Sequence, residues 1–396
     1  MCAIMPTIYK IVFVTFHLNV LFTQYITGNW AGPNYSKISQ DYKQLPALSQ
    51  VPPMNASDLP PLAFSTLDEV QRSAPLDPND PCTFYDPPVP NFRAPGRRIS
   101  EVKCFEYIWQ VKRRDERVRR TKECMERKNV PGIIGGHPTN AGEFPNMGAI
   151  GWKAVIGGWK FMCSSSLISS KFVVTAAHCS SASERDTTLM DVVPKIVRLG
   201  SRNILDGSNY GVSPVDVDII KIIVHPKYKS PKLYYDIALM ELGRPQIFSF
   251  NIQPACLWTK HDFGMYSRKA NVTGWGVTQA GSLNTSPDLL VAEIDIIDST
   301  TCGNLLRSSC NRNWCGVQEY QLCAGKLSGG VDACQGDSGG PLTVKIPLPI
   351  TTQGNMNYIL GVTSFGVGCA LPDLPGIYTR ISSFIDWIEP IVWPGQ

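Results

Sequence analysis

The sequence lacks features that would place the protein in a membrane or on a nucleic acid. After the first 28 residues, no stretch approaches the roughly 18 uninterrupted apolar residues of a transmembrane helix. The 37 basic and 33 acidic residues leave a formal net charge of only +4, which by itself does not indicate a nucleic-acid partner. There is no internal repeat of fixed period and only five histidines. We therefore expect no membrane span, no nucleic-acid partner and very few candidates for a general base.

Residues 1–28 have the pattern of a secretory signal peptide. Lys10 precedes the apolar run "IVFVTFHLNVLF", which is too short to span a bilayer, and small residues near Gly28 offer a cleavage site. A membrane anchor is the alternative interpretation. Removal of Cys2 leaves twelve of the thirteen cysteines, an even number that fits an oxidising compartment. We therefore predict a secreted, extracellular protein, in which Asn-x-Ser/Thr sequons begin at Asn34, Asn55, Asn271 and Asn284.

Two segments with different compositions follow the signal. Residues 29–100 are rich in Pro, Ser, Asn and Asp, cannot bury much apolar surface, and are predicted to form a flexible arm. Residues 101–128, by contrast, contain neither Gly nor Pro and predict a surface helix, followed by a linker that ends at residue 132. The basic run "KRRDERVRR" in this helix is open to three interpretations: a solvated face, an anion-binding surface, or a processing site at "RVRR".

From residue 133 to residue 396 the pattern changes to short apolar β-rich runs separated by turn residues. Examples are "KFVVTAA", "DIIKIIVHP" and "GIYTRI". This alternation predicts an all-β domain, either a barrel or a sandwich. Near the end, "SSFIDWIEPIV" has a serine start and helical spacing, which predict a C-terminal helix.

Three residues carry a possible catalytic chemistry. His178 in "TAAHC" follows an apolar run and precedes a cysteine, so a disulfide would hold the imidazole rigidly. Asp236 opens the apolar run "DIAL", where a buried carboxylate needs a hydrogen-bonding partner such as an imidazole; alone, it is equally well read as a strand-start residue. Ser338 in "GDSGGP" lies among glycines that would let the amides of Gly336 and Ser338 point at one developing oxyanion.

Residues 133–390 resemble a trypsin/chymotrypsin-type serine protease domain through seven motifs in the family's order. These are "IIGG", "TAAHC", "DIAL", "TGWG", "GDSGGP", "SFG" and "PGIYTR". The resemblance implies two six-stranded antiparallel β-barrels with the active site between them. It also implies that His178 is the base, Asp236 its orienting partner and Ser338 the nucleophile. The pro-segment and "EFPNMGAIGW" further resemble insect clip-type proteases of the snake-like group, although only three cysteines precede Ile133, whereas a clip module has six.

The resemblance also implies a specificity pocket. Asp332 matches the charged base of the pocket, Gly366 and Gly376 match its walls, and Ser364 matches a further substrate-binding position. A carboxylate at the bottom of an apolar slot favours Arg or Lys. Taken alone, Asp332 would be a solvated loop aspartate.

The activation switch is implied in the same way. In this family, cleavage before the residue that matches Ile133 frees an amine, which pairs with the aspartate that matches Asp337. The residue before Ile133 is Gly132 and not Arg or Lys, so a trypsin-like activator should not cut there. Either an activator of unusual specificity exists, or the protein is never switched on. A second departure is "CSSSL" at residues 163–167, where many relatives have two glycines after the cysteine.

The cysteines match the family in part. The resemblance implies the pairs Cys163–Cys179, Cys302–Cys323 and Cys334–Cys369, and Cys310 with Cys315 is expected to form a local bridge. Cys104 and Cys124 are about 30 Å apart along the predicted helix, so they should not pair with each other. Cys256 occupies the position that often tethers the pro-segment, and we favour the pairs Cys124–Cys256 and Cys82–Cys104.

The sequence thus predicts a secreted serine endopeptidase zymogen that cleaves proteins after Arg or Lys without a metal or organic cofactor. Its expected partners are protein substrates, an upstream activating protease and serpin-type inhibitors, in an extracellular cascade. A non-catalytic homologue that binds partners and a broad digestive or venom protease are the alternatives.

Overall fold

The computed structural model describes residues 80–82, 89–127, 143–205, 213–264, 268–276, 286–329, 336–347, 355–367 and 371–396. The predicted signal peptide and most of the predicted flexible arm lie outside these residues. So do Gly132, Ile133, Asp332, Cys334, Cys369 and the sequons at Asn34, Asn55 and Asn284. Within the described residues, no helix is long and apolar enough to cross a membrane.

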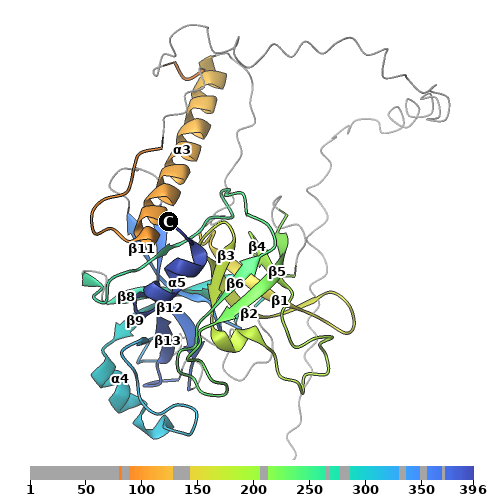
Figure 1. Ribbon diagram of the computed structural model, residues 1–396, viewed down its shortest axis with the longest axis vertical. Coiled ribbons are helices and arrows are strands. Elements are labelled where there is room, and N and C mark those ends of the chain that lie inside the picture. Colours follow the sequence, from red (N-terminus) through yellow and green to blue (C-terminus); the bar gives the residue numbers. More distant parts are fainter. Residues whose placement is uncertain are drawn as a thin grey trace, which may run out of the picture. The chain divides into compact units, whose positions relative to one another are not determined.

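The first barrel is a closed sheet of six antiparallel strands, drawn in yellow and green in Figure 1. Its strands, in the order β1-β2-β3-β6-β5-β4, pair around the whole circumference. They are β1 (Met147–Lys153), β2 (Trp159–Leu167), β3 (Phe172–Thr175), β4 (Ile196–Leu199), β5 (Val215–Val224) and β6 (Ala238–Leu242). Apolar side chains such as Val174, Leu199 and Leu239 are fully buried inside it, as the β-rich runs predict.

The second barrel is also six-stranded and is drawn in cyan and blue in Figure 1. Its strands run β11-β8-β9-β10-β13-β12, and the β11–β12 pairing closes the ring. They are β8 (Lys269–Gly274), β9 (Leu290–Ile297), β10 (Gln321–Gly325), β11 (Pro341–Pro347), β12 (Asn355–Phe365) and β13 (Gly376–Arg380). The two-barrel prediction is confirmed. One addition was not predicted: the short strand β7 (Cys256–Leu257) pairs parallel to β12 at Tyr358 and Ile359.

Two helices pack against the barrels, and both were predicted. The C-terminal helix α5 (Ile385–Val392) buries Ile385 and Ile388 in the same apolar cluster as the interior of the first barrel. The pro-segment helix α3 (Ile99–Arg127) contacts β7 and α5 near its start, and it is drawn in orange in Figure 1. A third helix, α4 (Ser299–Leu305), precedes β10 and is capped by the carboxylate of Asp298.

The first part of α3 is fixed to the rest of the domain by a disulfide, a ring contact and a hydrogen bond. Cys104 is 3% exposed and forms a disulfide with Cys256 of β7. Beside it, the Tyr107 ring packs edge-on against Phe248 at 5.6 Å. At the start of the helix, the hydroxyl of Ser100 donates to Glu389 of α5 at 2.7 Å. The helix is therefore joined to both α5 and the second barrel by its first turns.

The predicted pairing of the pro-segment cysteines is wrong. The structure pairs Cys104 with Cys256 and Cys82 with Cys124, and not Cys124 with Cys256 and Cys82 with Cys104. The reason lies in the direction of α3: Cys104 faces β7, and at 1.5 Å rise per residue Cys124 is about 30 Å further along the axis. The expectation that Cys104 and Cys124 do not pair with each other is confirmed.

The other described disulfides match the predictions. Cys163–Cys179, Cys302–Cys323 and Cys310–Cys315 are all formed. The predicted Cys334–Cys369 bridge lies outside the described residues.

Candidate active site

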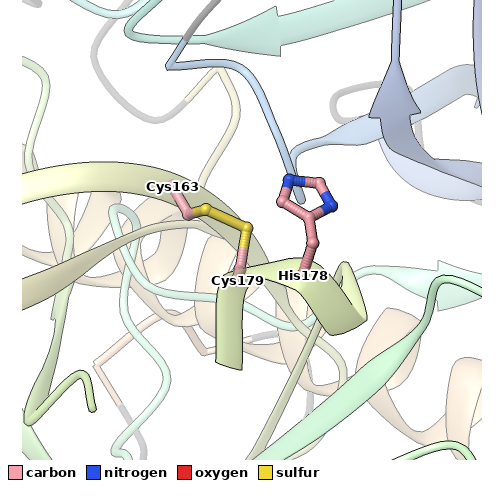
Figure 2. A group of neighbouring side chains, drawn as sticks. All are labelled: Cys163, His178 and Cys179. Carbon is pink, nitrogen blue, oxygen red and sulfur yellow. A yellow bond between two sulfur atoms is a disulfide. The ribbon is translucent and has the colours of Figure 1, made fainter. Parts of the chain in front are cut away.

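His178 lies on a short 3-10 turn, Ala177–Ser180, that leaves the end of β3. Cys179 on the same turn is bonded to Cys163 of β2, and Figure 2 shows this disulfide beside the imidazole. Two neighbouring strands of one barrel therefore hold the turn on both sides. The side chain of His178 remains 29% exposed, so the imidazole is rigidly placed but reachable.

The same turn contains a group of potential metal ligands that we exclude as a metal site. The side-chain ligand atoms of Cys163, His178 and Cys179 lie within 4.8 Å of one another (Figure 2). Both sulfur atoms are joined in the disulfide, so neither offers the thiolate that binds a metal.

Asp236 lies just before β6 and is 1% exposed. Its Oδ2 atom is 2.8 Å from Nδ1 of His178, and its Oδ1 atom accepts a hydrogen bond of 2.9 Å from the backbone N–H of the same residue. Neighbouring strands explain the meeting, because Thr175 at the end of β3 pairs with Ala238 at the start of β6. Asp236 is therefore the buried partner of His178 that the sequence predicted.

Two residues of the second barrel complete the surroundings of Asp236. The hydroxyl of Ser364 in β12 donates to Oδ2 of Asp236 at 2.5 Å, and the hydroxyl of Thr379 in β13 donates to its backbone carbonyl at 2.8 Å. Both residues are buried. The sequence resemblance implied a substrate-binding role for Ser364 and did not indicate the bond from its side chain to this carboxylate. Nothing in the sequence pointed to Thr379.

Burial and charge act in opposite directions on this pair. Burial alone would lower the pKa of His178, but the negative charge of Asp236 and the hydrogen bond to it outweigh burial and raise the pKa above 6.5. Burial would likewise raise the pKa of Asp236, yet the charge and hydrogen bonds of His178, with the hydroxyl of Ser364, keep that pKa below its usual value. The pair therefore favours an ionised carboxylate that stabilises an imidazolium.

Ser338 is half-buried on the loop 336–340 that leads into β11. The carbonyl of Ser338 accepts a hydrogen bond of 2.8 Å from the N–H of Ser164 in β2. The next residue, Gly339, has a φ of +78° and no space for a side chain: a Cβ would lie 2.1 Å from Oγ1 of Thr175 and 3.2 Å from the backbone nitrogen of Ala176. The loop thus packs tightly against Thr175 and Ala176, just before the turn that carries His178.

The candidate oxyanion loop begins at Gly336, where φ is +99°, in the left-handed region that favours glycine. Its carbonyl accepts a hydrogen bond of 3.3 Å from the hydroxyl of Ser164. The serines of "CSSSL" were expected only to depart from the family pattern, and no role was predicted for them. The signal available was a hydroxyl beside Cys163, where a glycine is common.

The side chain of Asp337 lies against the end of β8. Its Oδ1 atom accepts a hydrogen bond of 2.8 Å from the N–H of Gly276. A Cβ at Gly274 or Gly276 would lie 2.1 Å or 2.3 Å from its carboxylate oxygens, so glycine at both positions makes room for this side chain. Ile133, its predicted partner after activation, lies outside the described residues.

The specificity pocket is described only in part, since Asp332 lies outside the described residues. Gly366, just after β12, is exposed, and Gly376 is the buried first residue of β13. These two strands are hydrogen-bonded neighbours. The structure therefore brings the two predicted wall positions to adjacent strands.

The comparison with known proteins agrees with this arrangement. The Trypsin family model matches residues 133–388, which is more than half of the chain. The chain belongs to the trypsin family. The two barrels, the motif order and the contact between His178 and Asp236 are those that the sequence resemblance implied.

The relatives of this trypsin-family chain include insect clip-type proteases. It is 37% identical to "Serine protease snk" of Drosophila melanogaster over 306 residues, covering 75% of this chain and 66% of that protein. It is 40% identical to "Serine protease Hayan" of the same organism over 67% of this chain and 39% of that protein. It is 32% identical to "CLIP domain-containing serine protease B4" of Anopheles gambiae over 66% of this chain and 70% of that protein. The chain thus spans less than two thirds of the first two relatives.

Proposed function

We propose that the protein is a secreted serine endopeptidase zymogen that cleaves proteins after Arg or Lys. The observation that carries the proposal is the 2.8 Å contact between His178 and Asp236, with the loop of Ser338 packed against the strand that leads to His178. A buried carboxylate, a reachable imidazole and a serine on a tightly held glycine loop form the combination that nucleophilic acyl transfer requires.

The mechanism assigns one role to each of the three residues. His178 accepts the proton of the Ser338 hydroxyl as the oxygen attacks the carbonyl carbon of the cleaved bond. Asp236 fixes the tautomer of His178 and stabilises the imidazolium that forms. The amides of Gly336 and Ser338 stabilise the oxyanion of the tetrahedral intermediate. His178 then protonates the leaving amine, and a water molecule hydrolyses the acyl-enzyme by the same steps in reverse order.

Specificity for Arg or Lys depends on Asp332. A carboxylate at the bottom of the pocket pairs with the cationic end of the substrate side chain by charge-assisted hydrogen bonds. Gly366 and Gly376 leave room for the long aliphatic part of that side chain. Replacing Asp332 by serine should remove the preference for a basic residue.

Activation requires a new terminus at Ile133, whose ammonium group pairs with Asp337. The glycines at positions 274 and 276 support this role, because only residues without a Cβ leave room for the carboxylate of Asp337 at this place. Because Gly132 precedes the cut, the activator is a protease with a preference other than Arg or Lys. By analogy with its clip-type relatives, the protein acts in an extracellular cascade, where serpin-type inhibitors would control it.

Gly132 is also the observation that favours a second function. If no protease cuts after this residue, the chain would remain a secreted binding protein with an intact but unused site. A broad digestive or venom protease is less well supported, because a pro-segment helix held by two disulfides fits a regulated enzyme better.

The test uses the full chain expressed as a secreted protein. Any processed form is identified by N-terminal sequencing and treated with a serine-directed fluorophosphonate. A Gly132→Arg variant, cut by an arginine-specific protease, supplies the Ile133 terminus if no natural activator is found, and Ser338→Ala in the same background is the matched control. Labelling that needs both the Ile133 terminus and Ser338 supports the enzyme, whereas a correctly processed form that is never labelled supports the binding protein.

A further inference from the structure

Ser164 is a buried residue of the first barrel that is bonded to the nucleophile loop of the second. It lies in β2 next to Cys163 and is 1% exposed. Its N–H donates to the carbonyl of Ser338 at 2.8 Å, and its hydroxyl donates to the carbonyl of Gly336 at 3.3 Å. Its own carbonyl accepts from the hydroxyl of Thr175 at 2.8 Å. Two polar groups of this one residue therefore bond to the loop of Ser338, and the third bonds to β3 within the first barrel.

The two bonds that Ser164 donates hold the backbone on both sides of Asp337. One fixes the carbonyl of Gly336 and the other fixes the carbonyl of Ser338, so the peptide group that carries the N–H of Ser338 lies between two anchored carbonyls. Gly336 has a φ of +99° and no side chain, so its own torsions restrict the loop little. The carbonyl of this peptide, from Asp337, accepts a hydrogen bond of 2.9 Å from the N–H of Gly340 within the loop. The two bonds from Ser164 hold the peptide groups on either side of it from outside the loop.

We propose that Ser164 is a positioning residue for the oxyanion hole, whose hydroxyl holds the backbone at Gly336 so that the amides of the loop are oriented before substrate binds. The inference rests on the proposed function, because it matters only if Ser338 forms a tetrahedral intermediate. If the peptide turned away, the buried hydroxyl of Ser164 would lose its acceptor, which is energetically unfavourable. Amides that need no reorientation during the reaction stabilise the oxyanion most effectively.

The neighbouring residue provides a matched control. Ser165 lies in the same strand, is fully buried, and also donates its hydroxyl to the carbonyl of a glycine, Gly148, at 3.1 Å. That glycine lies in β1, within the first barrel, and not on the loop of Ser338. The substitutions Ser164→Ala and Ser165→Ala therefore remove equivalent groups, but only the first removes a bond to the loop.

The experiment compares the two variants in the full chain carrying Gly132→Arg and activated to the Ile133 terminus. The kcat and KM for an arginyl peptide substrate are measured, with the Ki of an arginyl peptide aldehyde, whose adduct places an oxyanion in the hole, and of benzamidine, which occupies only the pocket. We expect Ser164→Ala to lower kcat about three- to tenfold and to weaken the aldehyde by a similar factor, with KM and the benzamidine Ki unchanged. Ser165→Ala should leave all four constants unchanged.

Each other outcome overturns the inference for a stated reason. Equal losses of kcat in both variants would mean that the hydroxyls act only through stability, and no loss in either would mean that the loop needs no anchor. If Ser164→Ala does not fold, Ser164→Gly is measured instead, and failure of both variants to fold would show that the hydroxyl serves the fold. If the unsubstituted enzyme with an Ile133 terminus is itself inactive and unlabelled, the proposed function fails, and the inference falls with it.

Discussion

The two barrels contribute to the candidate site in different ways. The first barrel brings His178 and Asp236 together through neighbouring strands of one closed sheet, where Thr175 pairs with Ala238. The second barrel contributes Ser338 on a loop that is bonded to Thr363 of its own strand β12 and also to Ser164 of the first barrel. The charge couple of His178 and Asp236 is thus built within one barrel, whereas the loop of Ser338 is held by bonds to both barrels.

This difference separates substitutions into two classes. Changes to the couple should alter proton transfer and its pH dependence while the barrels stay intact. Changes at the junction should displace Ser338 while the pKa of His178 stays the same. Ser364 is an exception to this division, because it belongs to the second barrel but its hydroxyl donates to the carboxylate of Asp236. Its substitution is therefore the most informative test.

Asp236→Asn should have the largest effect on the couple. Without the carboxylate the imidazole loses its orienting acceptor, and kcat should fall about 10⁴-fold, as loss of this group does in trypsin-type proteases. The negative charge of Asp236 raises the pKa of His178. In the proposed mechanism the neutral imidazole is the base. Removing that charge lowers the pKa, so the acid limb of the kcat/KM profile should move to lower pH. A pH–rate profile of the activated variant measures both effects.

The control is Asp216→Asn, which removes an exposed carboxylate of the first barrel bonded to Arg198 at 2.7 Å. It should leave the acid limb in place. An Asp236→Asn profile whose acid limb does not move would contradict the role of this charge.

The disulfide between Cys104 of α3 and Cys256 of β7 provides a test that concerns the second barrel. Replacing both Cys104 and Cys256 by alanine opens a bridge between residues 152 positions apart and should lower the free energy of unfolding by about 3–5 kcal/mol. Hydrogen exchange should rise in β7 and β12 and not in the first barrel. Replacing both Cys82 and Cys124, which join α3 only to the segment before it, should have a much smaller effect on the barrels. Equal effects of the two pairs, measured by denaturant unfolding, would contradict the observed direction of α3.

The sequence predicted the couple and both barrels because the decisive information is local. Each of "TAAHC", "DIAL" and "GDSGGP" carries its candidate catalytic residue at a strand end or in a glycine turn, and the apolar runs match the strands. The pairing of Cys104 depends instead on which face of α3 meets β7, and no short motif records that contact. The bond from Ser164 to Gly336 joins residues 172 positions apart, so it was visible only after the barrels were assembled.

Gly339→Ala tests the junction directly. A Cβ at this position would lie 2.1 Å from the hydroxyl of Thr175 and 2.4 Å from the carbonyl of Ser164, so the loop must move to accept it. A displacement of about 1 Å at a nucleophile is enough to reduce kcat about 10²-fold. Gly316→Ala is the matched control, because Gly316 also has a positive φ of +93° but nothing within 4 Å of the added carbon. Similar kcat values for the two activated variants would show that the loop of Ser338 tolerates movement.

Ser364→Ala should have the smallest effect and the most specific one. The hydroxyl of Ser364 donates to the same carboxylate oxygen that contacts Nδ1 of His178, and it helps to keep the pKa of Asp236 low. Removing the hydroxyl leaves the negative charge of Asp236 less compensated, so the carboxylate attracts the imidazolium more strongly and the pKa of His178 rises further. The neutral base then forms only at higher pH, and the acid limb of the kcat/KM profile should move upward.

The direction of this shift is what distinguishes Ser364 from a residue of the substrate pocket. Ser364→Ala and Asp236→Asn should move the acid limb in opposite directions, while kcat on its plateau falls about tenfold or less in Ser364→Ala. A substitution that only widened the pocket would raise KM and leave the limb in place. Thr379→Val, which removes a hydroxyl bonded to the backbone carbonyl of Asp236 and not to its carboxylate, is the control for the loss of a buried hydroxyl from the second barrel. If both variants leave the limb unmoved, the second barrel would contribute only Ser338 and its loop, and the couple would belong to the first barrel alone.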